Sequence, residues 1–144
     1  MPSLTQRQQA ALTEAVAELA EPGTKPESTV ATLVQLVAAQ NQPTRDHVAL
    51  AVRLALSELA HRQPGQSVEL RVPPYAAVQV GAGVDGPGAG PRHTRGTPPA
   101  VVEMTPPVLL KLLVGQLTWL QAVAERQVSA SGAHTDLSGL FPLS

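Results

Sequence analysis

The densest group of positive charges in the chain lies in the segment PRHTRG. Arg92, His93 and Arg95 fall within four positions of a sequence in which only 15% of the residues are charged. The planar guanidinium group of arginine binds carboxylate or phosphate oxygens through two parallel hydrogen bonds. The segment therefore predicts an anion-binding loop. The alternative is a solvated or structural loop whose arginines pair with nearby acidic side chains, which would be Glu69, Asp85 and Glu103.

A glycine-rich segment precedes this cluster. GAGVDG, from Gly81 to Gly86, matches the pattern G-x-G-x-x-G of dinucleotide-binding proteins. In those proteins a helix follows directly, and its N-terminus holds the phosphate. Here PGAGP follows, and two prolines among glycines do not start a helix. We interpret residues 81–91 as an inserted loop and expect no nucleotide cofactor.

The residue types of a catalytic triad occur together near the C-terminus. Ser129, Ser131, His134 and Asp136 lie within eight positions, but no serine is part of a G-x-S-x-G elbow. Short runs of serine and aspartate are typical of turns and helix caps. We therefore expect these residues to shape a turn, and we expect no enzyme activity from them.

The histidines are too dispersed to predict a metal site. His47 and His61 are fourteen positions apart on one expected helix. At 1.5 Å per residue they lie about 21 Å apart, which is too far for a shared ion. The sequence has no cysteine, so it has neither disulfides nor thiolate ligands. No metal or other cofactor is expected.

Composition limits the classes of partner. The formal net charge is −1, so the overall field does not attract nucleic acid. No apolar run approaches the roughly 20 residues of a membrane span, and the first residues lack the pattern of a signal peptide. We expect a soluble cytoplasmic protein with no nucleic-acid partner and no integral membrane contact. The abundance of Ala, Gly, Pro and Arg suggests a GC-rich bacterial genome.

Three helices are expected in the first part of the chain, at 3–20, 29–40 and 45–62. Each carries apolar residues at helical spacing, and prolines and glycines separate them. Ser3 and Gln6 fit a capping box at the first helix, and Thr44 is positioned to cap the third.

The period then changes to two. Strands are expected at 67–72, 75–80, 99–104 and 128–131, with helices at 106–114 and 118–126 and a last turn capped by Asp136. Strands grouped before helices favour an α+β fold, an antiparallel sheet with helices on one face. We divide the chain into helices at 1–64, packed on the sheet, and an α+β region at 65–144.

From about Ser67 onward the sequence resembles the sterol carrier protein family, and most of all its small bacterial, actinobacterial-type members. The resemblance lies in RVPPYAAVQ, PRHTRGTPPAVVEM, LLKLLVGQLTWLQAVA and VSASGAHTDLSGLFPL. Gly115 to Thr118 matches a G-x-L-T/S step between two helices, and Ser131-Gly132 matches the end of the last strand. The family often has a glycine before that strand, where this chain has Arg126-Gln127.

The resemblance implies a sterol-carrier-like fold: a small, mainly antiparallel sheet of about four strands, covered by helices that enclose an apolar tunnel for a lipid or acyl chain. The expected lipid-binding residues are Val68, Leu70, Val72, Val78, Val80, Val101, Leu109, Leu112, Leu113, Trp119, Val123 and Phe141. The same aliphatic residues also describe an ordinary filled core. If Val101 points inward, Glu103 does too and needs a cation; if Val102 does, Glu103 faces outward.

Two functions remain open from the sequence. The first is non-catalytic binding of an apolar small molecule, with Arg92 and Arg95 orienting an acidic head group. The second is a protein-interaction or structural module with a filled core, in which the Arg92–Arg95 loop and Trp119 meet a partner or a second copy of the chain. Sterol-carrier-like domains also occur in mycothiol-dependent isomerases, but the first 64 residues lack the clustered histidines of those enzymes.

Overall fold

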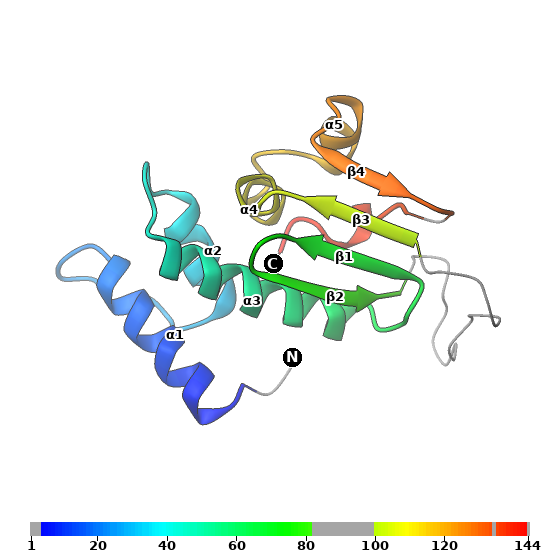
Figure 1. The fold of residues 1–144 in the computed structure, drawn as a ribbon. Coiled ribbons are helices and arrows are strands. Elements are labelled where there is room, and N and C mark those ends of the chain that lie inside the picture. Colours follow the sequence, from blue (N-terminus) through cyan, green and yellow to red (C-terminus); the bar gives the residue numbers. More distant parts are fainter. Residues whose placement is uncertain (1–3, 82–99, 134, 144) are drawn as a thin grey trace.

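The computed structural model describes residues 4–81, 100–133 and 135–143 and shows an α+β fold. The helical part and the sheet are drawn in Figure 1. The elements are α1 (Gln6–Leu19), α2 (Val30–Ala38), α3 (Arg45–Arg62), β1 (Val68–Val72), β2 (Ala76–Val80), β3 (Ala100–Met104), α4 (Pro106–Val114), α5 (Trp119–Ala124), β4 (Val128–Ser131) and a 3-10 turn, η1 (Ser138–Leu140).

The four strands form one sheet in the order β2-β1-β3-β4. The pairs β1–β2 and β3–β4 are antiparallel, as expected. The central pair, β1–β3, is parallel, with Leu70 opposite Val102. Two of the three pairings are antiparallel, so the sheet is mainly antiparallel, as the resemblance implied, and its central pair makes it mixed. Grouped strands predict a shared sheet, but they do not determine the direction in which its central strands pair.

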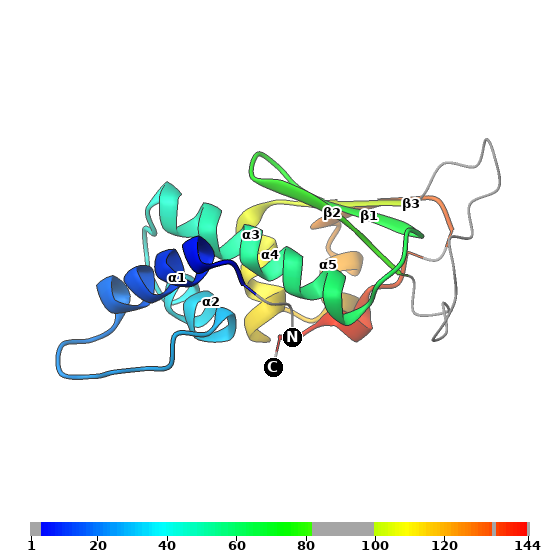
Figure 2. The ribbon, with the colours of Figure 1, turned by 90° about the horizontal axis from the view of Figure 1, so that it is seen from below.

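In the part of the chain that the structure describes, the helices cover one face of the sheet. Figure 2 shows the strands edge-on, with α3, α4 and α5 on the same side. On the uncovered face Arg71 donates to Glu69 over 2.7 Å, and Glu103 lies opposite Arg71 on the neighbouring strand. The hydrogen bond from Arg71 to Glu69 and the charges of both carboxylates raise the pKa of Arg71. This face is polar, so the core and any apolar site lie on the helical side.

Burial on β3 decides between the two alternatives for its valines. Val102 is fully buried, as are its neighbours Leu70 and Val72 on β1, whereas Val101 is only half-buried. Glu103 is exposed on the same face as Val101. The inward orientation that we expected for Val101 is therefore wrong, and Glu103 needs no buried cation.

The N-terminal helices are positioned by threonine caps. Thr5 and Gln8 form the capping box of α1, so the box expected at Ser3 and Gln6 is displaced by two residues. Thr44 caps α3 as predicted, and its side chain accepts a hydrogen bond from the amide of His47. Of the three helices expected to pack on the sheet, α3 packs on β2, while α1 packs on α2, and α2 on α3 and α4. Figures 1 and 2 show α1 and α2 extending past the end of the sheet.

Backbone conformations outside the usual regions mark both ends of strand β4. Helix α5 ends two residues earlier than expected, and Arg126 has a φ of 58°. That left-handed conformation favours glycine, which the resembling family often has just before the last strand. At the other end, Gly132 has a φ of +97°, and a Cβ there would lie 2.8 Å from the Cα of Ala100. The glycine of the Ser131-Gly132 step is thus required by the close approach of two backbones.

Candidate functional site: an apolar pocket beside Trp119

An apolar pocket of about 380 Å³ lies between the α4–α5 connection and the C-terminal segment. Figure 2 shows that segment on the same side of the sheet as α4 and α5. The pocket is at the small end of the usual range for ligand sites, about 300–1,000 Å³. Its walls are Leu112, Gly115, Leu117, Thr118, Trp119, Leu120, Ser138, Phe141 and Pro142.

Two stacked aromatic rings form part of this wall. The ring centroids of Trp119 and Phe141 lie 6.1 Å apart, and the ring planes differ by 10°. Such pairs stabilise by about 0.5–1.5 kcal/mol beyond the apolar area that they bury. Both side chains remain half-buried, so the pair also presents a surface to the pocket.

Local structure on α5 fixes the position of Trp119. Thr118 and Gln121 form the capping box predicted from the sequence, with hydrogen bonds of 2.9 and 3.1 Å. Gly115 ends α4 with a φ of 81°, a left-handed conformation that glycine adopts without strain. The sharp turn after α4 therefore places Trp119 at the first position of α5, beside the C-terminal segment.

The C-terminal segment is attached to α4 by its backbone. The amide of Leu143 donates to the carbonyl of Leu113 over 2.8 Å. Leu137, Leu140 and Leu143 are buried in the core and flank Phe141 in sequence. The position of Phe141 against Trp119 thus follows from the aliphatic anchors on either side of it.

Asp136 stabilises the turn that precedes η1. Its Oδ1 atom accepts a hydrogen bond of 2.9 Å from the amide of Ser138. This backbone hydrogen bond, with a further one from the Ser138 side chain, lowers the pKa of the Asp136 carboxyl. The carboxylate therefore has the turn-forming role expected from the sequence. Ser129 and Ser131 are exposed on β4, and His134 lies outside the described residues.

The pocket continues into a second depression of about 300 Å³ along α5. Trp119, Leu120 and Ser138 line both spaces, and Val123 and Asp136 complete the second. Leu120 is 78% exposed and Val123 is 46% exposed. The inward orientation expected for Val123 is therefore wrong, because Ala122 is the buried residue of α5. Val123 instead lies at the open side of the site.

The other expected lipid-binding residues divide into two groups. Leu112, Trp119 and Phe141 line the larger pocket. The buried group packs in the core cluster between the sheet and the helices: Val68, Leu70, Val72, Val80, Leu109 and Leu113. Val78 is half-buried against that cluster. Their assignment as ligand contacts stays a prediction, and so does that of Arg92, His93 and Arg95, which lie outside the described residues.

Sequence reasoning missed several wall residues. Leu117, Leu120 and Pro142 line the pocket, yet none of them was singled out as a contact. The sequence did contain a signal for Leu120. Consecutive residues of a helix point in different directions, so Leu120 and Trp119 cannot both face the core from a short helix. The contribution of Pro142 depends on where the tail folds back, which local sequence does not reveal.

The site holds few groups that could perform chemistry. Its described walls carry the hydroxyl groups of Thr118 and Ser138 and the carboxylate of Asp136. Within the described residues, no three histidine or acidic side chains are grouped as a metal site would require. None of the described helices is long and apolar enough to cross a membrane. These walls could accommodate an apolar ligand with a small polar end.

A family model described as the bacterial SCP ortholog matches residues 44–143. The chain belongs to the bacterial sterol carrier protein family. The match starts at the cap of α3 and runs through the tail that carries Phe141, so it covers more of the chain than the region from Ser67 that we recognised in the sequence. Helices α1 and α2 precede it. A search of curated proteins found no match.

Proposed function

We propose that this sterol carrier family protein is a non-catalytic carrier that binds an apolar small molecule, an acyl chain, in the pocket beside Trp119. The observation that carries the proposal is the apolar pocket of about 380 Å³ walled by Leu112, Trp119 and Phe141. Family membership supports a carrier role rather than an enzymatic one.

The chemistry of the wall supports an acyl ligand. Leucines and stacked aromatic rings give an acyl chain dispersion contacts and remove its surface from water. Thr118 and Ser138 offer hydroxyl groups that can orient a polar end. We further propose that Arg92 and Arg95 bind an acidic head group. The cytoplasmic location expected from the sequence stays a prediction.

The alternative function is a protein-interaction module, and a specific observation favours it. Leu120 and Val123 expose apolar surface next to each other on α5, and several side chains between the sheet and α3 are fully buried, among them Leu56, Leu70 and Val80. Exposed apolar side chains that are grouped mark interaction sites in many proteins. In this interpretation Leu120 and Trp119 contact a protein partner and no lipid enters.

Quenching of tryptophan fluorescence tests the carrier function directly. Trp119 is the sole tryptophan of the chain, so its emission has one source. A fatty acid brominated along its chain quenches an indole on contact. We expect saturable quenching with one molecule bound per chain. Native mass spectrometry of protein purified from its host should also show a lipid that organic extraction removes.

Two charge variants separate the carrier from the interaction module. Leu120→Glu places a charge at an exposed position of the pocket wall, and Ala77→Glu places the same charge on the exposed outer face of the sheet. Leu120→Glu should weaken quenching at least several-fold while Ala77→Glu leaves it unchanged. Absence of quenching in the unmodified protein, together with an empty native mass spectrum, would reject the carrier function and favour the interaction module.

A further inference from the structure

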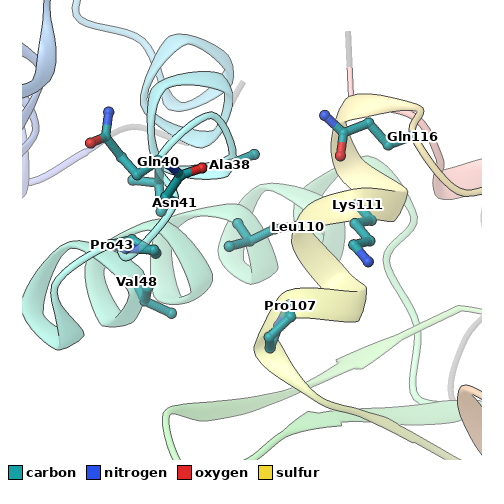
Figure 3. Close-up of a pocket in the computed structure, with 10 residues that line it drawn as sticks. Ala38, Gln40, Asn41, Pro43, Val48, Pro107, Leu110, Lys111 and Gln116 are labelled. Atoms are coloured by element: carbon teal, nitrogen blue, oxygen red, sulfur yellow. The ribbon is translucent and has the colours of Figure 1, made fainter.

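A further pocket, of about 280 Å³, lies where the end of α2 and the α2–α3 connection meet α3 and α4. Figure 3 shows its walls: the α2–α3 connection and the start of α3 on one side, α4 on the other. Its lining residues are Val37, Ala38, Gln40, Asn41, Pro43, Val48, Pro107, Leu110, Lys111 and Gln116. The family match begins at residue 44, so half of this wall comes from outside it.

The two parts of this wall differ in chemistry. Val37 and Leu110 are buried and make an apolar floor. Leu110 points from α4 across the space toward α3 in Figure 3. Around the floor stand three exposed amide side chains, Gln40, Asn41 and Gln116, which lie at the upper rim in the same view. The pocket thus has an apolar interior and a hydrogen-bonding rim.

The charge of this wall has one sign. Among the described lining residues, Lys111 carries the positive charge and none is a carboxylate. Within the described residues Lys111 forms no salt bridge, whereas Arg71 and Arg62 each pair with a glutamate. An ammonium group beside an apolar space, without a salt bridge to any described residue, favours a ligand that brings its own negative charge.

We propose that this pocket, which we call the Lys111 pocket, is a second ligand site that binds a small amphiphile with an apolar body and an anionic head, either a carboxylate or a phosphate monoester. The body lies on Ala38, Val48 and Leu110, and Lys111 pairs with the head. The site is distinct from the Trp119 pocket, with which it shares no lining residue.

Binding here would also stabilise the contact between α2 and the family region. A ligand would touch Ala38 of α2 and Leu110 and Lys111 of α4 at once. A ligand that binds only the assembled pocket favours the docked arrangement by mass action. The amphiphile therefore stabilises the packing of α2 against α4. A ligand in the pocket beside Trp119 would not have this effect.

The sequence provides an internal control for the test. It contains two lysines, Lys25 and Lys111. Reductive methylation with ¹³C-formaldehyde keeps their positive charge and gives each lysine its own NMR signal. Octanoate and octyl phosphate serve as anionic probes, and octanol serves as the neutral probe of the same length. We expect both anions to shift the Lys111 signal saturably and to leave the Lys25 signal in place.

Variants identify the pocket itself. Lys111→Gln should weaken octanoate binding by about five- to tenfold, the effect of one partly solvated charge-assisted hydrogen bond. Lys25→Gln should have no effect on binding. Ala38→Phe places a ring in the space and should abolish binding while the thermal unfolding temperature is kept. Octanol should bind the unmodified protein and Lys111→Gln equally weakly.

Three outcomes would overturn the proposal: no shift of Lys111 with either anion, equal shifts of both lysines, or binding that survives Ala38→Phe. Emission from Trp119, recorded in the same titrations, reports binding at the Trp119 pocket and so distinguishes the two sites. Octanoate that changes Trp119 emission without shifting Lys111 would support the carrier function and reject the Lys111 pocket. The reverse result would support the Lys111 pocket alone.

Discussion

Trp119 and Phe141 stack with their ring planes 10° apart, although 21 residues of chain separate them. One ring begins α5 and the other ends the η1 turn, so the contact joins the C-terminal segment to the helical layer. The pair belongs to the wall of the larger apolar pocket. Its geometry therefore links the stability of the tail to the shape of the candidate site.

Removal of the stacked ring should weaken both the tail and the site. Phe141→Leu keeps an apolar side chain but loses the ring contact, and should lower the free energy of unfolding by about 1 kcal/mol. Emission of Trp119 should move to longer wavelength, and quenching by the brominated fatty acid should weaken. Tyr75→Leu, at a half-buried aromatic that does not line the pocket, is the control. Equal losses of binding in both variants would contradict a specific role for the pair.

Because Gly132 lies so close to Ala100, adding one methyl group at Gly132 should strongly lower the stability of the fold. Gly132→Ala places a Cβ 2.8 Å from the Ala100 Cα and keeps a left-handed φ, so it should destabilise by about 2 kcal/mol or more. Gly23→Ala is the matched control, because Gly23 has a φ of +85° but open space around it, and it should cost about 1 kcal/mol. Urea unfolding of both variants gives the difference. Similar costs would show that the close approach is unimportant.

The polar contact between Glu18 of α1 and His47 of α3 should stabilise the folded protein weakly. His47 Nε2 lies 3.0 Å from Glu18 Oε2, and about half of the Glu18 side chain is exposed. A double-mutant cycle with Glu18→Gln and His47→Ala should give a coupling of about 0.2–1 kcal/mol. His47→Leu should be nearly neutral, because the buried Nδ1 atom of His47 has no hydrogen-bond partner in the described structure and its removal ends that cost.

Hydrogen exchange offers an independent check of the same contact. Amides of α1 should exchange faster in Glu18→Gln, while those of β1 and β3 should not change. Faster exchange across the whole chain would instead indicate global destabilisation.

Acid should weaken the C-terminal turn through Asp136. Its folded pKa lies below its unfolded value, because the ionised carboxylate accepts hydrogen bonds from Ser138. The resulting stabilisation is complete above the unfolded pKa, near 4, and is lost as the pH falls through the folded pKa. Asp136→Ala should therefore be less stable at neutral pH and should lose less stability on acidification. Unfolding curves at several pH values below 6 measure both effects, and parallel pH profiles would contradict this role.

If Arg92 and Arg95 bind an acidic head group, their removal should affect acidic ligands more than neutral ones. Arg92→Ala combined with Arg95→Ala should weaken binding of fatty acids several-fold and leave binding of the corresponding alcohols unchanged. Fluorescence titrations with both ligand types measure the selectivity. Equal losses for acids and alcohols, accompanied by a lower melting temperature, would assign these arginines to stability.

Local signals in the sequence determined most elements of this protein. Thr105-Pro106 and Gly115 bound α4 at the predicted residues because a cap, a proline and a left-handed glycine act within one turn of helix. Alternation in VELRV likewise predicted which residues of β1 are buried, since Glu69 and Arg71 leave one apolar face. Motifs from Ser67 onward also indicated the family.

Tertiary structure decided what local patterns leave open. The sequence AVVEM has adjacent valines, so alternation alone does not reveal that Val102 rather than Val101 is buried. Pairing of β3 with β1, and stacking of Trp119 on Phe141, join segments far apart in the chain, and short-range propensities do not encode such contacts. Which leucines fill the core and which line a pocket depends on how closely those segments pack, and that is a property of the whole fold.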